Sequence, residues 1–340
     1  DAAERAVASR AAPADEASFR RALAASPNSS FLWIRYVAHL LSLGEADRAR
    51  AALAQALDAI ALEATADRFN VWVAALNLEA SHGSGGSPSA SSAPDRAAAT
   101  LALFKRAARH TDAKKLHLAL APILERAGLG AAVVASAAAA ATKAFPSSCK
   151  VWLARHAAAL RAGDAPAAAA ALRAATVGGH DGKGALPPRK HVKFLSRAAV
   201  AEFKNSATAV EGENSGGSSE RGRELFEKLL AAAPKRLDLW AQYIDQEVGL
   251  ALAGTAGGKK RKRGDGAEKE GEKKLSKPDP RRARALFARG TALDLPPKKM
   301  KFLFRRALEF EKRLGDDAGA DRVREAARAY VARVSGGGGV

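Results

Sequence analysis

Large apolar residues recur along most of the chain at intervals of three and four positions, the periodicity of a helix with one buried face. The four tryptophans mark this pattern, because each stands early in such a segment. Three of them follow a proline by six residues, and a helix cannot continue through proline without losing a hydrogen bond. We therefore expect one helix to end before each proline and a new one to begin after it. The tryptophans are Trp33, Trp72, Trp152 and Trp240, and the prolines are Pro27, Pro146 and Pro234.

A fixed spacing follows the tryptophans. Tyr243 and Glu247 come three and seven residues after Trp240, and these offsets lie on one helical face. The ring, the smaller residue and the carboxylate therefore form one packed stripe, which we interpret as structural core rather than a base-stacking platform. Related sets begin at Trp33 (with Tyr36 and Leu40), Trp72 (Ala75, Glu79), Leu118 (Ala121, Glu125), Leu195 (Ala198, Glu202) and Phe304 (Ala307, Glu311), whereas Trp152 departs with Arg155 and Ala159.

A second helical segment follows each first one, and four of these begin with two arginines separated by one residue. The small residue between them can let paired helices approach closely. We expect the arginines themselves to face solvent, as charged rows on helices usually do. The four motifs are Arg48-Ala-Arg50, Arg221-Gly-Arg223, Arg282-Ala-Arg284 and Arg322-Val-Arg324.

Two-helix repeats of this size cannot bury their apolar faces alone, so neighbours must stack. The fold class is thus expected to be all-α, a right-handed superhelix of about seven helical hairpins after a leading helix near residues 15–25. The repeat region should span residues 15–334, after a linker at 1–14 and before a flexible tail at 335–340. Low-complexity inserts are expected at about 81–94, 178–188, 205–219 and 249–279, from their glycine, serine and charged residues.

Charge points to a polyanionic partner. Lys and Arg number 55 against 36 Asp and Glu, a formal charge of +19, and about a quarter of all residues are alanine, which favours helix. The last insert holds the basic run Lys259, Lys260, Arg261, Lys262 and Arg263, interpreted as a nuclear-import signal, a nucleic-acid contact or a solvated loop. Most of the excess charge lies elsewhere, spread along the helices, which suits an extended polyanion.

No pattern of catalytic or cofactor-binding residues is present. The single cysteine, Cys149, excludes an internal disulfide and a multi-cysteine zinc site. The glycine-rich stretch 178–184 has the wrong spacing for a phosphate-binding loop, and no histidine pair has helical zinc spacing. No stretch is long and apolar enough for a bilayer span. We therefore expect no enzyme activity, cofactor, metal, membrane contact or small-molecule substrate.

The repeated motif resembles the half-a-TPR (HAT) repeat of RNA-processing scaffolds. Trp-x-x-Tyr/Ala-x-x-x-Glu stands in the first helix and Arg-x-Arg-x-Leu-Phe in the second. Four ordered stretches, at 27–36, 69–79, 233–248 and 301–311, are similar to the carboxy-terminal HAT domain of the ribosomal RNA processing protein five (programmed cell death protein eleven) family. The similarity covers about residues 15–334, and the alanine-rich residues 131–177 match poorly.

This resemblance implies a non-catalytic scaffold in the nucleus and nucleolus, where the family acts on precursor ribosomal RNA within the small-subunit processome. It implies pre-rRNA, bound directly or indirectly, and processome proteins as partners. In the family an array of S1-type modules precedes the HAT domain. Two alternatives stay open: a HAT scaffold of another machine, for splicing or mRNA 3′-end cleavage, and a TPR-like peptide-binding adaptor.

Overall fold

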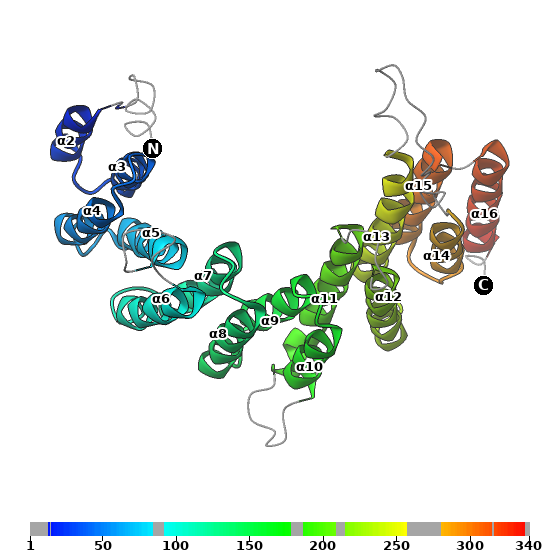
Figure 1. Cartoon of the computed structure of the whole chain (residues 1–340). Helices are drawn as coiled ribbons and strands as arrows, with labels where there is room; N and C mark the ends of the chain where they lie inside the picture. Colours follow the sequence, from blue (N-terminus) through cyan, green and yellow to red (C-terminus); the bar gives the residue numbers. More distant parts are fainter. Residues whose placement is uncertain are drawn as a thin grey trace, which may run out of the picture. The chain divides into compact units, whose positions relative to one another are not determined.

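The computed structural model describes residues 13, 15–83, 92–177, 186–208, 215–256, 280–314 and 316–336. Over these residues the regular structure is entirely α-helical, with fifteen helices and no strand (Figure 1). A leading helix precedes seven helical hairpins, which confirms the predicted all-α class and the expected number of hairpins. Within the same residues, none of the helices combines the length and apolar character that a bilayer span requires.

The chain divides into two compact units, Asp1–Leu186 and Pro187–Val340. The first unit opens with α2 (Glu16–Ala25), whose start is capped by the Asp15 side chain. Glycines with positive φ, Gly44, Gly128 and Gly163, turn the chain within three of its four hairpins. The hairpins are α3 (Ser30–Ser42) with α4 (Ala46–Ala59), α5 (Thr65–His82) with α6 (Ala93–Ala107), α7 (Ala113–Arg126) with α8 (Ala131–Ala144), and α9 (Cys149–Arg161) with α10 (Ala165–Thr176).

The second unit holds three hairpins, and its helices are longer than the sequence predicts. The helix α13 continues to Ala256, inside the range 249–279 expected as an insert, and α11 and α12 extend into the range 205–219. Of the residues expected as inserts, 84–91, 178–185, 209–214 and 257–279 lie outside the described residues. The hairpins are α11 (Pro188–Thr208) with α12 (Ser215–Ala232), α13 (Leu237–Ala256) with α14 (Arg281–Thr291), and α15 (Pro297–Leu314) with α16 (Asp317–Gly336).

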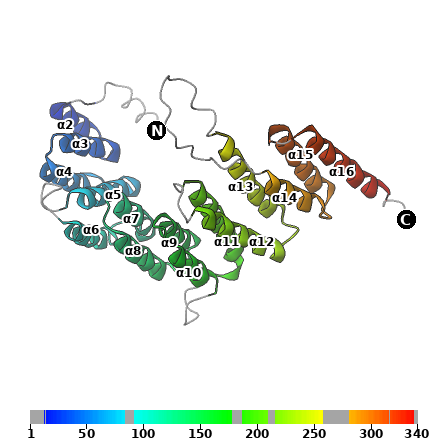
Figure 2. The ribbon, with the colours of Figure 1, turned by 45° about the vertical axis from the view of Figure 1, so that its right-hand side comes forward.

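Each unit has two layers. The first helices of successive hairpins contact one another: α3, α5, α7 and α9 in one unit, and α11, α13 and α15 in the other. Each second helix packs against its own first helix and against the first helix of the next hairpin in the same unit. Figure 2 shows α5, α7 and α9 in one row and α6, α8 and α10 in another. The junction between hairpins is therefore a three-helix contact, and the repeated motif residues lie there.

Apolar clusters fill these contacts. One joins α2 to α5 around Trp33 and Leu53, and a second joins α5 to α9 around Trp72 and Leu120. A third fills the second unit around Trp240 and contains the aromatic rings of Phe203, Phe226, Phe287 and Phe310. Because each hairpin contributes only one face to its cluster, the buried area comes from the stack rather than from any single hairpin.

Candidate functional site

The tryptophans link each hairpin to the chain that precedes it. The indole Nε1 of Trp33 donates to the carbonyl of Pro27 at 2.9 Å, and that of Trp240 donates to Pro234 at 2.8 Å. Trp152 makes the same bond to Pro146, at 2.7 Å. Proline ends the preceding helix, which leaves its carbonyl free to accept the indole proton. The sequence explained these prolines only as helix breaks, whereas the structure makes them hydrogen-bond partners.

Trp72 lacks this partner because residue 66, six positions before it, is an alanine inside α5. Its Nε1 is buried without a hydrogen bond. The ring lies instead against His110, with centroids 6.0 Å apart, and the Arg106 guanidinium lies 5.5 Å from the ring centroid. All four tryptophans are at most 7 % exposed.

Three carboxylates of the stripe bind arginines of the preceding hairpin, whereas Glu125 binds Arg161 of the following hairpin and Glu202 binds Arg221 of its own. Glu247 accepts from Arg223 Nε at 2.6 Å and from its Nη2 at 3.1 Å, a two-pronged contact. Glu311 meets Arg284 in the same way, at 2.9 and 2.8 Å. Such forked pairs fix orientation as well as contributing energy. The three pairs that run from a second helix to the next first helix are Arg50–Glu79, Arg223–Glu247 and Arg284–Glu311.

The expectation of a solvated arginine row is wrong for the second arginine of three motifs, Arg50, Arg223 and Arg284, whereas Arg324 is exposed as expected. Arg223 keeps only 16 % of its side chain exposed. Burial would lower its pKa, but the bonds from Glu247 outweigh burial and leave the pKa of Arg223 raised. The residue between the arginines lies against the first helix. At Gly222 a Cβ would come within 2.7 Å of the Phe203 ring, so the close approach needs glycine.

Other members of the predicted core have different surroundings. Tyr243 is buried and stacks on Phe226, with ring centroids 4.9 Å apart. Tyr36 is buried with its hydroxyl 3.2 Å from Glu16 Oε1. Leu118, Leu195 and Phe304 are only half-buried, because apolar neighbours one or two positions away are the residues that face the core. Those fully buried neighbours are Leu116, Leu120, Phe194 and Leu303.

The first-helix layer of the second unit carries cations without partners. Arg189, Lys193 and Arg197 are exposed at successive turns of α11, and their side chains make no ion pair or hydrogen bond among the described residues. On α15, which holds seven basic and two acidic residues, four cations are likewise exposed and unpaired. We call these seven residues the α11–α15 cations: Arg189, Lys193, Arg197, Lys298, Lys301, Lys312 and Arg313.

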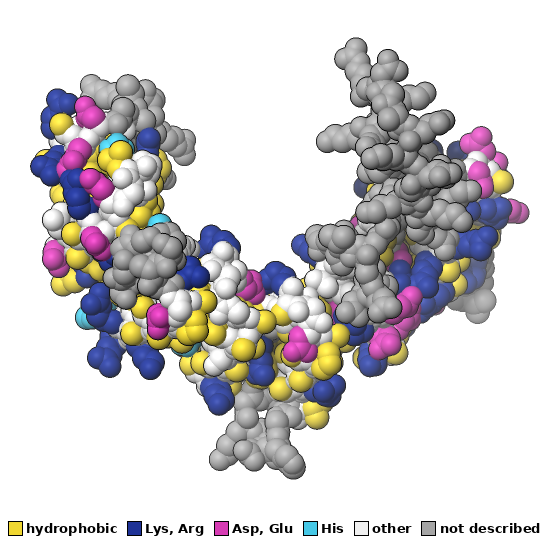
Figure 3. Space-filling view, in the orientation of Figure 1, with side chains coloured by type: hydrophobic (Ala, Val, Ile, Leu, Met, Phe, Trp, Pro, Cys, Tyr) yellow, Lys and Arg dark blue, Asp and Glu magenta, His cyan; other side chains and the backbone are white. Residues whose placement is uncertain are grey.

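The helix between them adds no free negative charge. The three acidic residues of α13 each pair with an arginine, Asp238 with Arg236, Asp245 with Arg306, and Glu247 with Arg223. The unpaired charge on this layer is therefore positive. Elsewhere Lys and Arg side chains are spread over both units rather than gathered on one helix (Figure 3). Within the described residues no group of His, Cys, Asp and Glu side chains could hold a metal ion.

Comparison with known proteins identifies the chain's relatives. No family model matches it. The rRNA biogenesis protein RRP5 of Arabidopsis thaliana is 34 % identical over 94 % of this chain, and that of Schizosaccharomyces pombe is 33 % identical over 94 %. The human protein RRP5 homolog is 30 % identical over 92 %. This chain belongs to the RRP5 family. It spans only 14–15 % of the length of these relatives.

The family resemblance predicted from the repeats is thus confirmed for RRP5. A solved structure of Naa15/Naa10 bound to HypK-THB also aligns, over 94 % of this chain and 49 % of that chain, with 13 % identity and a TM-score of 0.25, which supports no inference here. The basic run at 259–263 of this RRP5-family chain lies outside the described residues. The interhairpin ion pairs and the α11–α15 cations are the features that sequence reasoning missed.

Proposed function

We propose that this RRP5-family chain is a non-catalytic scaffold in ribosomal RNA biogenesis, and that the α11–α15 cations contact phosphates of pre-rRNA. Its curated relatives are named for rRNA biogenesis, which favours this role over splicing or mRNA 3′-end cleavage. The observation that carries the RNA contact is the set of exposed, unpaired Arg and Lys side chains on two first helices of one unit. The place of action is then the nucleolus, among small-subunit processome proteins.

The repeated carboxylates support a scaffold rather than an enzyme. A catalytic acid or base needs a carboxylate that is free to exchange a proton with a substrate. Glu79, Glu247 and Glu311 are each held by an arginine of the neighbouring hairpin. Their recurrence follows the packing of the fold, so their role is to set the position of one hairpin on the next.

Salt dependence of RNA binding tests the proposed contact. Each phosphate contact releases counterions, so the logarithm of the affinity falls linearly with the logarithm of salt, with a slope of roughly −0.7 to −0.9 per contact. We expect a steep slope for a pre-rRNA fragment titrated by filter binding between about 50 and 200 mM salt. The triple variant Lys298→Gln, Lys301→Gln, Lys312→Gln should reduce the slope by about 1 for each lysine that contacts a phosphate.

A matched control separates a defined surface from general charge. Lys105, Lys143 and Lys150 are exposed lysines of the first unit, and replacing all three by Gln removes the same net charge. We expect the control variant to keep the parental slope. Equal losses in the two triple variants would contradict a site at the α11–α15 cations, and a flat slope for the parent would contradict direct RNA binding.

A further inference from the structure

Two junctions in the first unit lack the arginine–glutamate pair of α4 with α5. At the junction of α6 with α7 the glutamate is present, as Glu125, but binds Arg161 of α9, whereas the junction of α8 with α9 lacks both residues. In the motif helices the residue between the two arginines is buried, as Ala49 is in α4. Val134 holds that buried position in α8, so Ala135 stands where Arg50 stands in α4. Seven residues after Trp152, where other hairpins place a glutamate, the chain has Ala159. Both halves of the pair are therefore alanine at the junction of α8 with α9.

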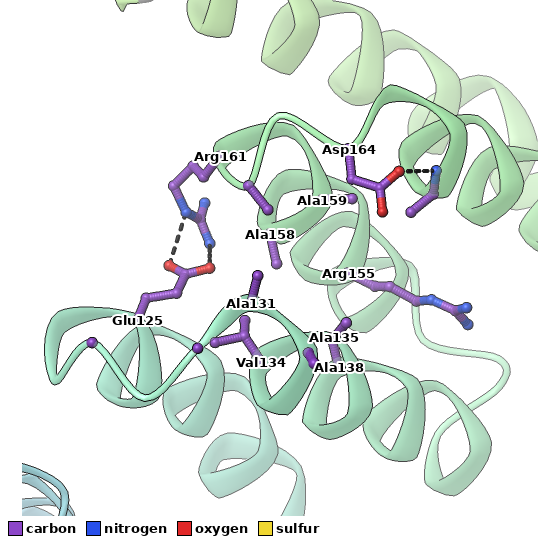
Figure 4. Close-up of a pocket in the computed structure, with 15 residues that line it drawn as sticks. Glu125, Ala131, Val134, Ala135, Ala138, Arg155, Ala158, Ala159, Arg161 and Asp164 are labelled. Atoms are coloured by element: carbon purple, nitrogen blue, oxygen red, sulfur yellow. Dashed lines mark hydrogen bonds and ion pairs between the residues drawn. The ribbon is translucent and has the colours of Figure 1, made fainter. Parts of the chain in front are cut away.

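Loss of the pair leaves an open groove. The space between α8 and α9 has a volume of about 700 Å³, and small side chains line most of it. The equivalent junction of α14 with α15 and α16 leaves about 290 Å³, because Arg284, Glu311 and Phe287 occupy it. Figure 4 shows Ala131 of α8 facing Ala158 of α9 across the gap. On the face drawn in Figure 3, apolar side chains gather over α8 and α10.

The α8–α9 groove has room for more than one large side chain. A cavity of about 150 Å³ lined by apolar side chains suffices to bind benzene, and ligand pockets typically span about 300–1,000 Å³. Val134, Ala138 and Ala158 form a buried floor, while Ala131 and Ala135 are exposed at the walls. Covering apolar surface of this kind with a partner is favourable, because it removes that surface from water.

Four charged residues line the groove. Asp164 is exposed and caps α10, accepting from the Ala167 backbone N–H at 2.8 Å, and two of the other three charges pair at one end. There Glu125 and Arg161 neutralise each other through bonds of 2.9 and 3.0 Å. At the other end lies Arg155, which has no carboxylate within ion-pair distance among the described residues. Its contacts are Thr142 Oγ1, at 3.1 Å, and the Trp152 ring, whose centroid is 5.7 Å from the guanidinium. Burial lowers the pKa of Arg155, as expected for a cation without a counter-charge.

We propose that the α8–α9 groove docks an amphipathic helix of a partner protein, which inserts large aliphatic side chains and presents a carboxylate to Arg155. Helices bind apolar grooves through side chains at positions i, i+3, i+4 and i+7, a spacing that places several anchors on one face. The bound helix supplies the bulk and the negative charge that Ala135 and Ala159 omit. This deepens the proposed scaffold role, on which it rests, by giving the first unit a protein site separate from the RNA contact.

A second copy of the chain is a poorer occupant. The described helix α16 has two large exposed apolar side chains three residues apart, Val331 and Val334. Exposed arginines stand beside them, Arg328 and Arg333. That charge repels Arg155 instead of pairing with it, so the groove fits an acidic amphipathic helix better.

The chain itself offers the variant that closes the groove. Ala135→Arg with Ala159→Glu installs the pair present at three other junctions, so the fold has a local precedent for it. Ala140→Arg is the matched control, because Ala140 is exposed on α8 and does not line the groove. Ala135→Leu fills the space without charge, and Arg155→Gln removes only the cation. Hydrogen exchange of α8 and α9 checks that each variant keeps its structure.

The probe is a phage-displayed library of 18-residue helical peptides with randomised positions on one face, selected on the full chain. We expect enriched peptides to carry Leu, Ile, Met or Phe at i and i+3 or i+4, together with one Asp or Glu. Binding of the synthesised peptide should weaken at least about 10-fold with Ala135→Arg/Ala159→Glu and with Ala135→Leu. Arg155→Gln should weaken it about 10-fold or more, the size of a lost charged hydrogen bond. Ala140→Arg should leave it unchanged.

Two results would overturn the proposal. One is a selected peptide that binds the groove-closing variants as tightly as the parent, or shows no preference for an acidic residue. The other is a dimer in sedimentation velocity that Ala135→Arg/Ala159→Glu dissociates, because the occupant would then be a second copy. The salt slope of RNA binding should be the same in the parent, Ala135→Arg/Ala159→Glu and Ala135→Leu, because neither variant changes the net charge. A failure of docking is thus distinguishable from a failure of the proposed function.

Discussion

The pair between Arg223 and Glu247 is the sharpest test of how one hairpin holds the next. Glu247 is 4 % exposed and has Arg223 as its ion-pair partner among the described residues. Arg223 has further acceptors, Ser219 Oγ at 3.2 Å and the exposed Glu220 at 2.9 Å. Breaking a buried pair leaves an uncompensated charge and typically costs 3–5 kcal/mol. The two single substitutions should therefore differ, because only one of them leaves a charge without a partner.

Glu247→Ala should cost about 3 kcal/mol, since Arg223 can still reach Glu220. Arg223→Ala should cost more, about 4–5 kcal/mol, since the buried carboxylate loses its ion pair and the Phe203 ring loses the guanidinium that lies 5.7 Å from its centroid. The double variant Arg223→Met, Glu247→Leu should come back close to the parent, because apolar residues of similar volume replace a buried pair at little cost.

Thermal unfolding of the full chain, with hydrogen exchange of α12 to α14 as the local readout, measures these differences. For a unit of this size each 1 kcal/mol shifts the melting temperature by about 2–4 °C, so Glu247→Ala should lower it by about 6–12 °C. Hydrogen exchange is needed because stacked repeats can open locally before the whole unit unfolds. Equal melting temperatures for the parent and both single variants, or a double variant as unstable as Arg223→Ala, would refute the reasoning.

Two further perturbations follow from buried nitrogen atoms. Trp240→Phe should lower the free energy of unfolding by about 1 kcal/mol through the lost Pro234 hydrogen bond, in addition to the loss of ring area. Trp72→Phe removes a donor that has no partner, so it should lower the free energy of unfolding distinctly less. Trp240→Ala should lower it by roughly 3–5 kcal/mol. Denaturant unfolding of the two Phe variants measures this difference, and equal losses of unfolding free energy would rule out the proline hydrogen bond as its cause. Burial lowers the pKa of His117, so the unfolded chain takes up its proton first and stability falls as the pH drops below about 6.5. His117→Leu should remove that part of the pH dependence, and an unchanged stability profile between pH 8 and 5 would contradict it.

The number of hairpins could be predicted from the sequence because the same motif recurs in successive hairpins. Prolines, tryptophans and glutamates recur at fixed offsets, and each recurrence independently predicts the start and the buried face of one helix. The register of the second helices was also readable, since Gly222 and Ala283 mark the close helix approach. What the pattern could not supply was the pairing between hairpins, because the arginine and its glutamate lie about 24–29 residues apart on different repeats.

The missed features share a physical cause. A charged residue on a helix is usually solvated, so Arg223 was expected to face solvent. It is largely buried instead because it lies against Glu247 of the next hairpin. The departure of Trp152 from the repeat, with Arg155 and Ala159, was visible in the sequence. Its consequence was not, because an alanine creates space only where both neighbours are also small. The α8–α9 groove exists since Ala135 and Ala159 coincide at one junction.

The most direct test of the account is ultraviolet crosslinking of the tagged full-length protein in cells, with sequencing of the attached RNA and mass spectrometry of the crosslinked peptides. If the α11–α15 cations contact pre-rRNA, the reads will come from precursor ribosomal RNA and the crosslinked peptides from α11 and α15. Reads from small nuclear RNAs or messenger RNA 3′ ends, or precursor reads with no crosslink in either helix, would contradict it.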